Sequence, residues 1–365
     1  MKKVLFLYLT AFSRTGGIEK FNRSFLKALA DISVDGVMDV LAISSHDITA
    51  DKKYIAATKF NGFAGNKVGF LLSTVYHAFR YNTIIIGHIN LALVGCIIKL
   101  LRPSVQLIVI THGIEVFEPL TGFKKQLLHR AGIILSVSNY TKSQLINFNQ
   151  EIDPNKIKIF PNTIDPYFTV PSIFEKPDYL LQRYHLNNAE IVLTIARLAS
   201  SEQYKGYDTV IKAWQEVLHQ RPSLQYLIFG KADTCEKEKV EGLIDEYGFT
   251  NSVHLMGYIK EEELTDHYLL ADVFVIPSKK EGFGIVFIEA MACGKKVVAG
   301  NQDGSVDALL NGELGTLVNP DDLQALSAAI VSSLDHQSNP FDIQQKVMAV
   351  FGFPQFKQRL QNYLA

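Results

Sequence analysis

Residues 276–299 read IPSKKEGFGIVFIEAMACGKKVVA, and this stretch decides the fold of its half of the chain. The apolar run at 273–276 ends at Pro277, as expected of a buried parallel strand. A second β-branched run follows at 296–299. The pattern therefore predicts a strand, a turn, a helix and a further strand.

The segment between these strands predicts a helix that is buried on all sides. Gly282 and Gly284 allow a tight turn with close backbone approach, and Gly294 can end the helix. Residues 285–293 contain almost no polar side chain, which is typical of a helix with no solvent-exposed face.

Two glutamates lie eight positions apart in this segment, one before the predicted turn and one within the predicted helix. Glu289 is the only charged residue of the helix, and a lone buried carboxylate is costly unless hydroxyls or a positive charge satisfy it. A ribose diol would do so. Glu281 precedes the helix, where the N–H groups of the first turn favour anions or sugar oxygens.

Composition indicates a globular protein with two domains. The 365 residues are 47% hydrophobic and 20% charged, which excludes a disordered chain. Residues 1–170 carry 19 Lys and Arg against 11 Asp and Glu, whereas the rest of the chain is acidic. The basic half favours an anionic partner such as a lipid-linked phosphate or a membrane surface, and uneven surface charge without function is the alternative.

The cysteines and the N-terminus indicate a reducing compartment. Cys96, Cys235 and Cys293 are odd in number and widely spaced, which predicts neither a disulfide framework nor a zinc site. The apolar run after Met1 is short, so we interpret it as the first strand and not as a signal peptide. We expect a cytoplasmic protein, either soluble or peripheral on the inner face of the plasma membrane.

Short apolar runs recur along both halves of the chain and alternate with helical patterns. This alternation predicts an α/β fold with two Rossmann-like, doubly wound domains that face each other across a cleft. The predicted strands are 4–9, 83–86, 107–110, 133–137, 191–195, 224–229, 253–255, 273–276 and 296–299.

Two cations lie where a strand of the second half ends. Arg197 follows the strand at 191–195, and Lys205 with Gly206 precedes a helix that begins near Asp208. Departure of a nucleoside diphosphate develops charge on its oxygens, and preorganised Arg and Lys donors stabilise that charge without a metal.

These segments together resemble the retaining, nucleotide-sugar-dependent glycosyltransferases of the GT-B fold, known as glycosyltransferase group 1 or family 4. The resemblance rests on the Glu281 and Glu289 pair with Arg197 and Lys205. It implies that the two cations hold the diphosphate and that Glu289 holds the ribose hydroxyls. Glu281 and the amides of Gly282, Phe283, Gly284 and Ile285 would hold the sugar and phosphates.

The first half contributes two further candidates. Gly16 and Gly17 lie at the start of an amphipathic helix, where the backbone can approach a phosphate or sugar, and a plain turn is the alternative. The resemblance implies that the Gly17 amide meets the distal phosphate or the acceptor. It also implies that His112, at the end of a strand, lies beside the transferred sugar, and that His88 contacts the acceptor.

The resemblance also sets the domain limits and the cofactor prediction. It implies an N-terminal acceptor domain at 1–168, a donor-nucleotide domain at 169–345, and a final helix at 346–365 that crosses back to the first domain. We expect a linker near 168–188, where no period is sustained. No Asp-x-Asp occurs, so we expect no metal and no other cofactor. The UDP- or GDP-sugar is a substrate.

Two features depart from a simple match. Asp303-Gly304 replaces the more typical Gly-Gly and leaves contacts near the donor sugar open. Residues 64–81 combine large apolar side chains with Lys67 and Arg80 at the ends. We favour a core helix there. The alternative is an interfacial membrane segment, which would make the acceptor lipid-linked.

The sequence therefore predicts a metal-independent retaining hexosyltransferase that acts on a hydroxyl of a saccharide or lipid-linked acceptor. We expect no nucleic-acid partner. Two alternatives stay open, a sugar-nucleotide epimerase of similar fold and a catalytically silent scaffold that binds sugar nucleotides.

Overall fold

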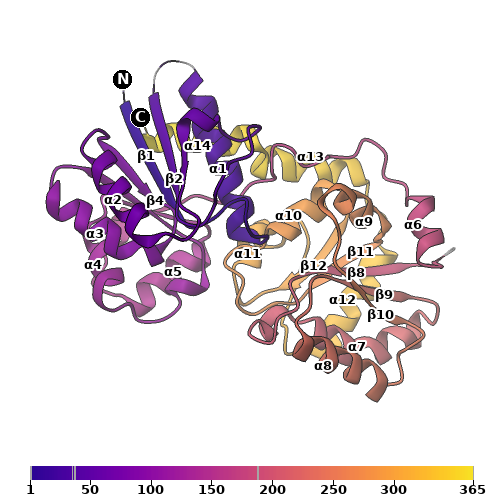
Figure 1. The fold of residues 1–365 in the computed structure, drawn as a ribbon. Helices are drawn as coiled ribbons and strands as arrows, with labels where there is room; N and C mark the ends of the chain where they lie inside the picture. Colours follow the sequence, from indigo (N-terminus) through magenta and orange to yellow (C-terminus); the bar gives the residue numbers. More distant parts are fainter. Residues whose placement is uncertain (1, 35, 37, 187–188, 365) are drawn as a thin grey trace. The chain divides into compact units, whose positions relative to one another are not determined.

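A computed structural model describes residues 2–34, 36, 38–186 and 189–364. The chain divides into two compact units, which Figure 1 shows as two α/β structures. Unit 1 comprises Met1–Pro166 and Phe351–Ala365, and unit 2 comprises Tyr167–Val350.

Over the described residues, the strands of unit 1 form one parallel sheet in the order β3-β2-β1-β4-β5-β6-β7. The strands are β1 (Lys2–Tyr8), β2 (Met38–Ser44), β3 (Phe60–Gly62), β4 (Thr83–Ile86), β5 (Gln106–Thr111), β6 (Ile133–Ser136) and β7 (Ile157–Ile159). The α-helices are α1 (Gly17–Val34), α2 (Lys67–Ala78), α3 (Ala92–Leu101), α4 (Gly122–Arg130), α5 (Asn139–Phe148) and α14 (Phe353–Leu364). Short 3-10 turns are η1 (Ala57–Lys59), η2 (Ile89–Leu91), η3 (Ile114–Val116) and η4 (Pro154–Lys156).

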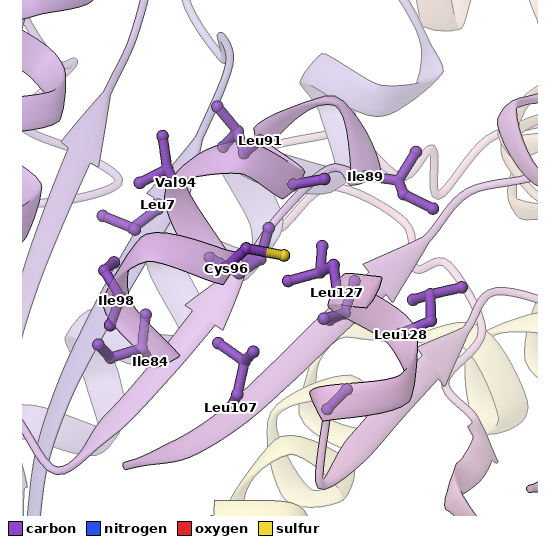
Figure 2. Close-up of a cluster of buried hydrophobic side chains, with 14 of the residues drawn as sticks. Leu7, Ile84, Ile89, Leu91, Val94, Cys96, Ile98, Leu107, Leu127 and Leu128 are labelled. Carbon is purple, nitrogen blue, oxygen red and sulfur yellow. The ribbon is translucent and has the colours of Figure 1, made fainter. Parts of the chain in front are cut away.

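Helices cover both faces of this sheet because successive side chains of each strand point to opposite faces. On one face, Leu5 and Leu7 of β1 belong to a core cluster with residues of α2, α3, α4 and α5. Figure 2 shows part of this cluster, with Cys96 and Ile98 of α3 lying over the sheet. On the other face, the ring of Phe6 lies 4.8 Å from that of Phe25 in α1.

The final helix α14 packs against α1 in unit 1. Phe356 is fully buried, with ring centroids 4.6 Å from Phe160, 5.7 Å from Phe21 and 6.3 Å from Phe25. The single final helix predicted at 346–365 is wrong in its bounds, because α13 continues to Phe351 and α14 begins at Phe353. The apolar face of α14 completes an aromatic cluster with α1.

The described strands of unit 2 also form one parallel sheet, in the order β10-β9-β8-β11-β12-β13. The strands are β8 (Ile191–Ile195), β9 (Gln225–Phe229), β10 (Val253–Gly257), β11 (Val273–Ile276), β12 (Lys296–Gly300) and β13 (Thr316–Val318). The α-helices are α6 (Asp178–Arg183), α7 (Tyr207–Gln220), α8 (Thr234–Glu246), α9 (Leu264–Leu270), α10 (Ile285–Ala292), α11 (Ser305–Ala308), α12 (Leu323–Asp335) and α13 (Pro340–Phe351). Its 3-10 turns are η5 (Gln203–Lys205), η6 (Glu261–Glu263) and η7 (Leu310–Gly312).

The predicted fold class is confirmed, since each unit is a doubly wound parallel sheet. Every predicted strand is found within two residues of its expected limits. The strands β2, β3, β7 and β13 were not predicted, and three of them are only three residues long. The linker prediction is partly wrong, because Asp178–Arg183 forms α6.

Two observations bear on the membrane interpretation. None of the helices in the described part of the chain is long and apolar enough to span a bilayer. Helix α2 buries Phe70 and Ala78, but Val68, Leu72 and Tyr76 are exposed. The favoured core-helix interpretation therefore holds for only one face of α2.

We predict that Phe356→Ala destabilises unit 1 by about 3–5 kcal/mol, because it leaves a cavity beside the three aromatic rings of Phe21, Phe25 and Phe160. Hydrogen exchange of α1 and α14 measures the change. The single tryptophan, Trp214, is buried in unit 2 and serves as an internal control for that unit. Phe123→Ala is the matched variant, since Phe123 is 51% exposed. Equal protection of α1 in both variants would contradict the prediction.

Candidate active site

The topology of unit 2 gathers the predicted charged residues at one edge of its sheet. The strand order reverses between β8 and β11, and ligands of doubly wound sheets bind at the carboxyl ends of the strands at such a point. Arg197 and Lys205 lie in the connection after β8, and Glu281 lies in the connection after β11. Three predicted site residues thus come from the two strands that flank the switch point.

These residues form an ion-pair network. The Lys205 ammonium donates to the Glu281 carboxylate, and it lies 4.0 Å from Glu202 Oε2. Arg197 pairs with Glu202 from the other side. The Lys205 and Glu281 side chains are 16% and 15% exposed, whereas the Arg197 side chain is 63% exposed. The network therefore has a shielded centre at Lys205 and an open end at Arg197.

The surroundings of Lys205 keep its side chain charged. Burial lowers the pKa of Lys205, but the Glu281 carboxylate and Tyr204 together outweigh burial, and the pKa is raised above its ordinary value. The ammonium also lies 5.3 Å from the centre of the Tyr204 ring, within the range of a cation–π contact. A positive charge is thus held at a fixed position at the sheet edge.

Two glycines let the two connections approach each other. Gly206 has φ +81°, and a Cβ there would lie 2.3 Å from the Pro277 carbonyl oxygen, so a side chain would push the β8 connection away from β11. Gly284 has φ +88° and directly precedes α10, as the sequence predicted for a tight turn. Phe283 beside it is buried.

Asp303 holds Glu281 in place. Its carboxylate is fully buried and accepts the backbone N–H of Glu281 at 2.8 Å, the Ser278 hydroxyl at 2.7 Å and the N–H of Ser305 at 2.9 Å. Gly304 also donates its N–H to the Glu281 carbonyl at 2.9 Å. Asp303, part of the Asp303-Gly304 pair that departs from the typical Gly-Gly, thus links the connection after β12 to the connection after β11 by hydrogen bonds.

The same burial changes the acidity of Asp303. Burial raises the pKa of Asp303 to about 6, and the nearby Glu281 charge adds to the increase. The hydrogen bonds from Ser305, Glu281 and Ser278 act in the opposite direction. The tie therefore carries a full negative charge only above about pH 6.

Glu289 lies inside unit 2 on α10. Glu289 is 1% exposed, and its carboxylate accepts a hydrogen bond from the Tyr268 hydroxyl at 2.9 Å. The Tyr268 hydroxyl therefore supplies at least one of the hydrogen bonds that we expected a ribose diol to donate. The role of Glu289 in ribose binding stays a prediction.

In unit 1, a second buried carboxylate organises the loop that leads to Gly16 and Gly17. The Asp47 carboxylate accepts three successive backbone N–H groups, of Ala11 at 2.8 Å, Phe12 at 3.1 Å and Ser13 at 2.9 Å. The hydroxyls of Thr10 and Ser44 also donate to it at 2.9 Å. The chain then enters α1 at Gly17.

Hydrogen bonding dominates the acidity of Asp47. Burial raises the pKa of Asp47, but the hydrogen bonds from Ala11, Ser13 and Ser44 outweigh it and bring the pKa below its ordinary value. The carboxylate therefore stays ionised at neutral pH. The loop at 10–13 is fixed by charge-assisted hydrogen bonds.

His112 and His88 lie at the carboxyl edge of the unit 1 sheet. His112 follows β5, its Nε2 lies 2.8 Å from the Gly87 carbonyl oxygen, and its backbone N–H donates to Glu115. The ring of His88, which follows β4, is 5.9 Å from that of His112. The structure thus brings the two predicted histidines together.

His88 is a neutral imidazole at neutral pH. Burial lowers the pKa of His88 to about 4, and the charges of His112 and Lys124 lower it further, while Glu115 opposes them. Its Nδ1 accepts the N–H of Asn90 at 3.0 Å, so the ring proton is on Nε2.

Four residues of these sites were not predicted from the sequence. They are Asp47, Glu202, Tyr268 and, in its role of holding Glu281, Asp303. Glu202 lies within the segment that contains Arg197 and Lys205, so its i, i+3 spacing to Lys205 was the available signal. The other three act across 21 or more positions of sequence, where spacing gives no signal.

Comparisons with known proteins agree with the predicted family. Residues 182–347 match the family model described as glycosyl transferases group 1. Over 240 residues the chain is 30% identical to the GDP-mannose-dependent alpha-(1-6)-phosphatidylinositol monomannoside mannosyltransferase of Mycolicibacterium smegmatis, covering 62% of this chain and 60% of that protein. It is 29% identical over 218 residues to O-antigen chain mannosyltransferase B of Escherichia coli, covering 58% and 54% of the two chains.

Solved structures share the fold over the whole chain. The crystal structure of Anabaena HepE in complex with UDP superposes with a TM-score of 0.80 at 21% identity and covers 100% of this chain and 99% of that chain. Sucrose-phosphate synthase from Thermosynechococcus elongatus gives a TM-score of 0.74 at 22% identity, with 100% and 98% coverage. At these identities, the likeness shows the fold alone. The chain spans about 60% of the length of the curated M. smegmatis relative.

We predict that Asp303→Asn destabilises unit 2 by about 1–3 kcal/mol at neutral pH. The amide NH2 cannot accept, so the variant loses either the hydrogen bonds from Glu281 and Ser278 to Oδ2 or that from Ser305 to Oδ1. Urea unfolding followed by the fluorescence of Trp214 measures the change. Asp321→Asn is the matched control, since the Asp321 side chain is 61% exposed.

The pH dependence of the same variant provides a second readout. The folded-state pKa of Asp303, about 6, exceeds the ordinary value of 3.8, so folded protein retains this proton between these limits after unfolded chains have lost it. This group therefore lowers the free energy of unfolding as the pH rises from about 4 to about 6, by roughly 1.4 kcal/mol per pH unit at most. Asp303→Asn removes that slope. An unchanged slope in the variant would contradict the assignment.

Proposed function

We propose that this chain, whose residues 182–347 match the model of the glycosyl transferases group 1 family, transfers a hexosyl unit from a nucleoside diphosphate sugar to a hydroxyl of a saccharide or lipid-linked acceptor. The observation that carries the proposal is the shielded Lys205 ammonium between Glu281 and Glu202, with Arg197 at the open end. This group lies at the topological switch point of unit 2, where a doubly wound sheet binds its ligand.

The chemistry of this group fits a diphosphate leaving group. Cleavage of the bond between the sugar and the diphosphate develops negative charge on the phosphate oxygens. A guanidinium and an ammonium held in place stabilise that charge more in the transition state than in the ground state. In this proposal Arg197 and Lys205 bind the diphosphate directly, and no metal or other cofactor takes part.

The remaining residues take the roles that the family resemblance implies. Glu281, with the amides of Gly282, Phe283, Gly284 and Ile285, binds the donor sugar and phosphates, and Glu289 binds the ribose. In unit 1, His112 stabilises the reacting face of the sugar. Gly16 and Gly17 approach the distal phosphate or the acceptor through their backbone. The ties from Asp303 to Glu281 and from Asp47 to the loop at 10–13 support this arrangement.

We further propose that the reaction retains the configuration of the transferred sugar. This proposal rests on the family resemblance, and the M. smegmatis relative is named for GDP-mannose and an alpha-(1-6) linkage. In this chain the leaving phosphate would take the proton of the acceptor hydroxyl on the same face. GDP-mannose is therefore the first donor to test. UDP-glucose follows, because HepE has been crystallised with it.

Peripheral contact with an anionic membrane is part of the same proposal. Its supports are the basic first half of the chain and the relative that acts on a phosphatidylinositol monomannoside. The acceptor in that case is lipid-linked, and the protein works from the cytoplasmic face.

We predict that Lys205→Ala weakens GDP or UDP binding by roughly 10- to 100-fold, since one charge-assisted hydrogen bond to a phosphate contributes about 1.5–3 kcal/mol. Titration calorimetry with each nucleotide gives the dissociation constants. Lys212→Ala is the matched control, because Lys212 is an exposed lysine of α7 that pairs with Asp208. Equal affinities for Lys205→Ala and wild type would place the diphosphate elsewhere.

We predict that transfer from GDP-mannose gives an α-linked product. NMR of the anomeric proton and its one-bond carbon coupling, recorded on the first product formed, distinguishes the two anomers. Clean inversion would exclude the retaining mechanism. Epimerised donor without acceptor would instead indicate the epimerase, and absence of transfer and hydrolysis across a donor panel would indicate the scaffold.

A further inference from the structure

The outer faces of α2 and α3 carry an apolar surface that the sheet does not cover. Exposed apolar side chains recur at helical spacing on both helices, and the two helices pack against each other. We define this α2–α3 face by Val68, Leu72 and Tyr76 of α2 and Leu93, Leu100 and Leu101 of α3. Their exposed fractions range from 46% to 70%.

This arrangement differs from scattered exposed apolar residues, which are common on soluble proteins. Val68, Leu72 and Tyr76 follow each other at i, i+4 and i+8, which places them in one row along α2. On α3 the opposite side faces the core, where Ile98 and Cys96 lie over the sheet in Figure 2. Each helix therefore has one apolar side for the core and a second apolar side facing solvent.

The charged residues of α2, of α3 and of the segments on either side of them have one sign, and the nearby carboxylate of Asp39 in β2 is paired with Lys59. Between Asp51 and Glu115 the sequence contains seven Lys and Arg residues and no Asp or Glu. Lys67 and Arg80 flank the two ends of α2, and both are exposed. Arg102 follows α3 and donates to the Tyr81 carbonyl oxygen at 2.6 Å and to that of Ala78, so a cation is fixed where α2 and α3 end.

We infer that the α2–α3 face docks on the surface of an anionic lipid bilayer. Apolar side chains flanked by Lys and Arg, with no carboxylate among them, match both parts of such an interface, the acyl boundary and the phosphate headgroups. A protein partner would require complementary acidic groups around an apolar centre. A second copy of the same face would place cations against cations, which disfavours a symmetric dimer.

The position of the face fits a lipid-linked acceptor. Leu93 lies in the first turn of α3, five residues after His88, at the carboxyl edge of the unit 1 sheet where His88 and His112 meet. A bilayer on the α2–α3 face would therefore hold an acceptor headgroup near this edge. The inference rests on the membrane contact of the proposed function and locates it on one face, and its test needs neither donor nor acceptor.

The test is sedimentation of the full chain with vesicles of phosphatidylglycerol and phosphatidylcholine in equal parts, and with phosphatidylcholine alone. Wild type should bind the anionic vesicles preferentially. Leu72→Glu combined with Leu100→Glu should weaken binding roughly 100-fold, about tenfold for each buried leucine lost. Lys67→Gln combined with Arg80→Gln should weaken binding roughly fivefold per charge.

Matched controls separate docking from folding and from the proposed function. Ile173→Glu combined with Tyr258→Glu changes two residues of unit 2 that are 66% and 59% exposed, and it should bind vesicles as wild type does. Nucleotide affinity should be the same in all these variants. If wild type binds anionic vesicles but binds no nucleotide, the proposed donor binding is rejected and the docking inference stands.

Three vesicle results would overturn the inference. Leu72→Glu/Leu100→Glu could bind vesicles as tightly as wild type does, wild type could bind both vesicle types equally, or wild type could bind no vesicles. A dimer in light scattering that the same double variant dissociates would identify a second copy as the occupant and would also overturn it.

Discussion

The hydrogen bond from the Glu281 backbone to the buried Asp303 carboxylate is the constraint on which the charged site of unit 2 depends. It fixes the turn that carries the Glu281 side chain, and that side chain in turn holds the Lys205 ammonium. Unit 1 uses the same device, since Asp47 fixes the loop before Gly17 through three backbone N–H groups. In both units a buried carboxylate from a neighbouring connection holds the backbone of a loop in one conformation, and such preorganisation is what electrostatic catalysis requires.

Under the proposed function, the ion pairs of unit 2 set a condition on how the donor binds. Lys205 and Arg197 are balanced by Glu281 and Glu202, so an incoming diphosphate must share or replace these carboxylate partners. A displaced Glu281 would be left as a shielded, unpaired carboxylate, which is unfavourable. Sugar hydroxyls can satisfy it by donating hydrogen bonds. In this arrangement the phosphates take over the cations, and the sugar hydroxyls replace the lost partner of Glu281. A nucleotide without its sugar would leave Glu281 with fewer hydrogen-bond partners.

Sequence patterns predicted the parts of this structure that local chemistry determines. Apolar runs gave the central strands, and glycine positions gave the turn at Gly284, because burial on both faces and positive φ leave direct traces in composition. The strands β3, β7 and β13 are three residues long and depend on their neighbours in the sheet. The role of Asp303 depends on a contact across 22 positions, so the sequence showed only an unusual residue. For α2, composition could not separate the core face from the exposed face, because both are apolar.

The two proposals place donor and acceptor surroundings in different units. The candidate nucleotide site lies in unit 2, and the apolar, cationic α2–α3 face lies in unit 1. A nucleotide sugar is a charged molecule that arrives from water, and Glu202 and Glu281 pair with Arg197 and Lys205, the cations to which we propose that the donor binds. If the acceptor is lipid-linked, as proposed, it is confined to a membrane surface, and the few exposed leucines and cations of the α2–α3 face suit reversible binding to that surface. Reversibility matters because each turnover must exchange the acceptor, so a permanently inserted helix would serve this chemistry less well than an exposed face that binds and releases.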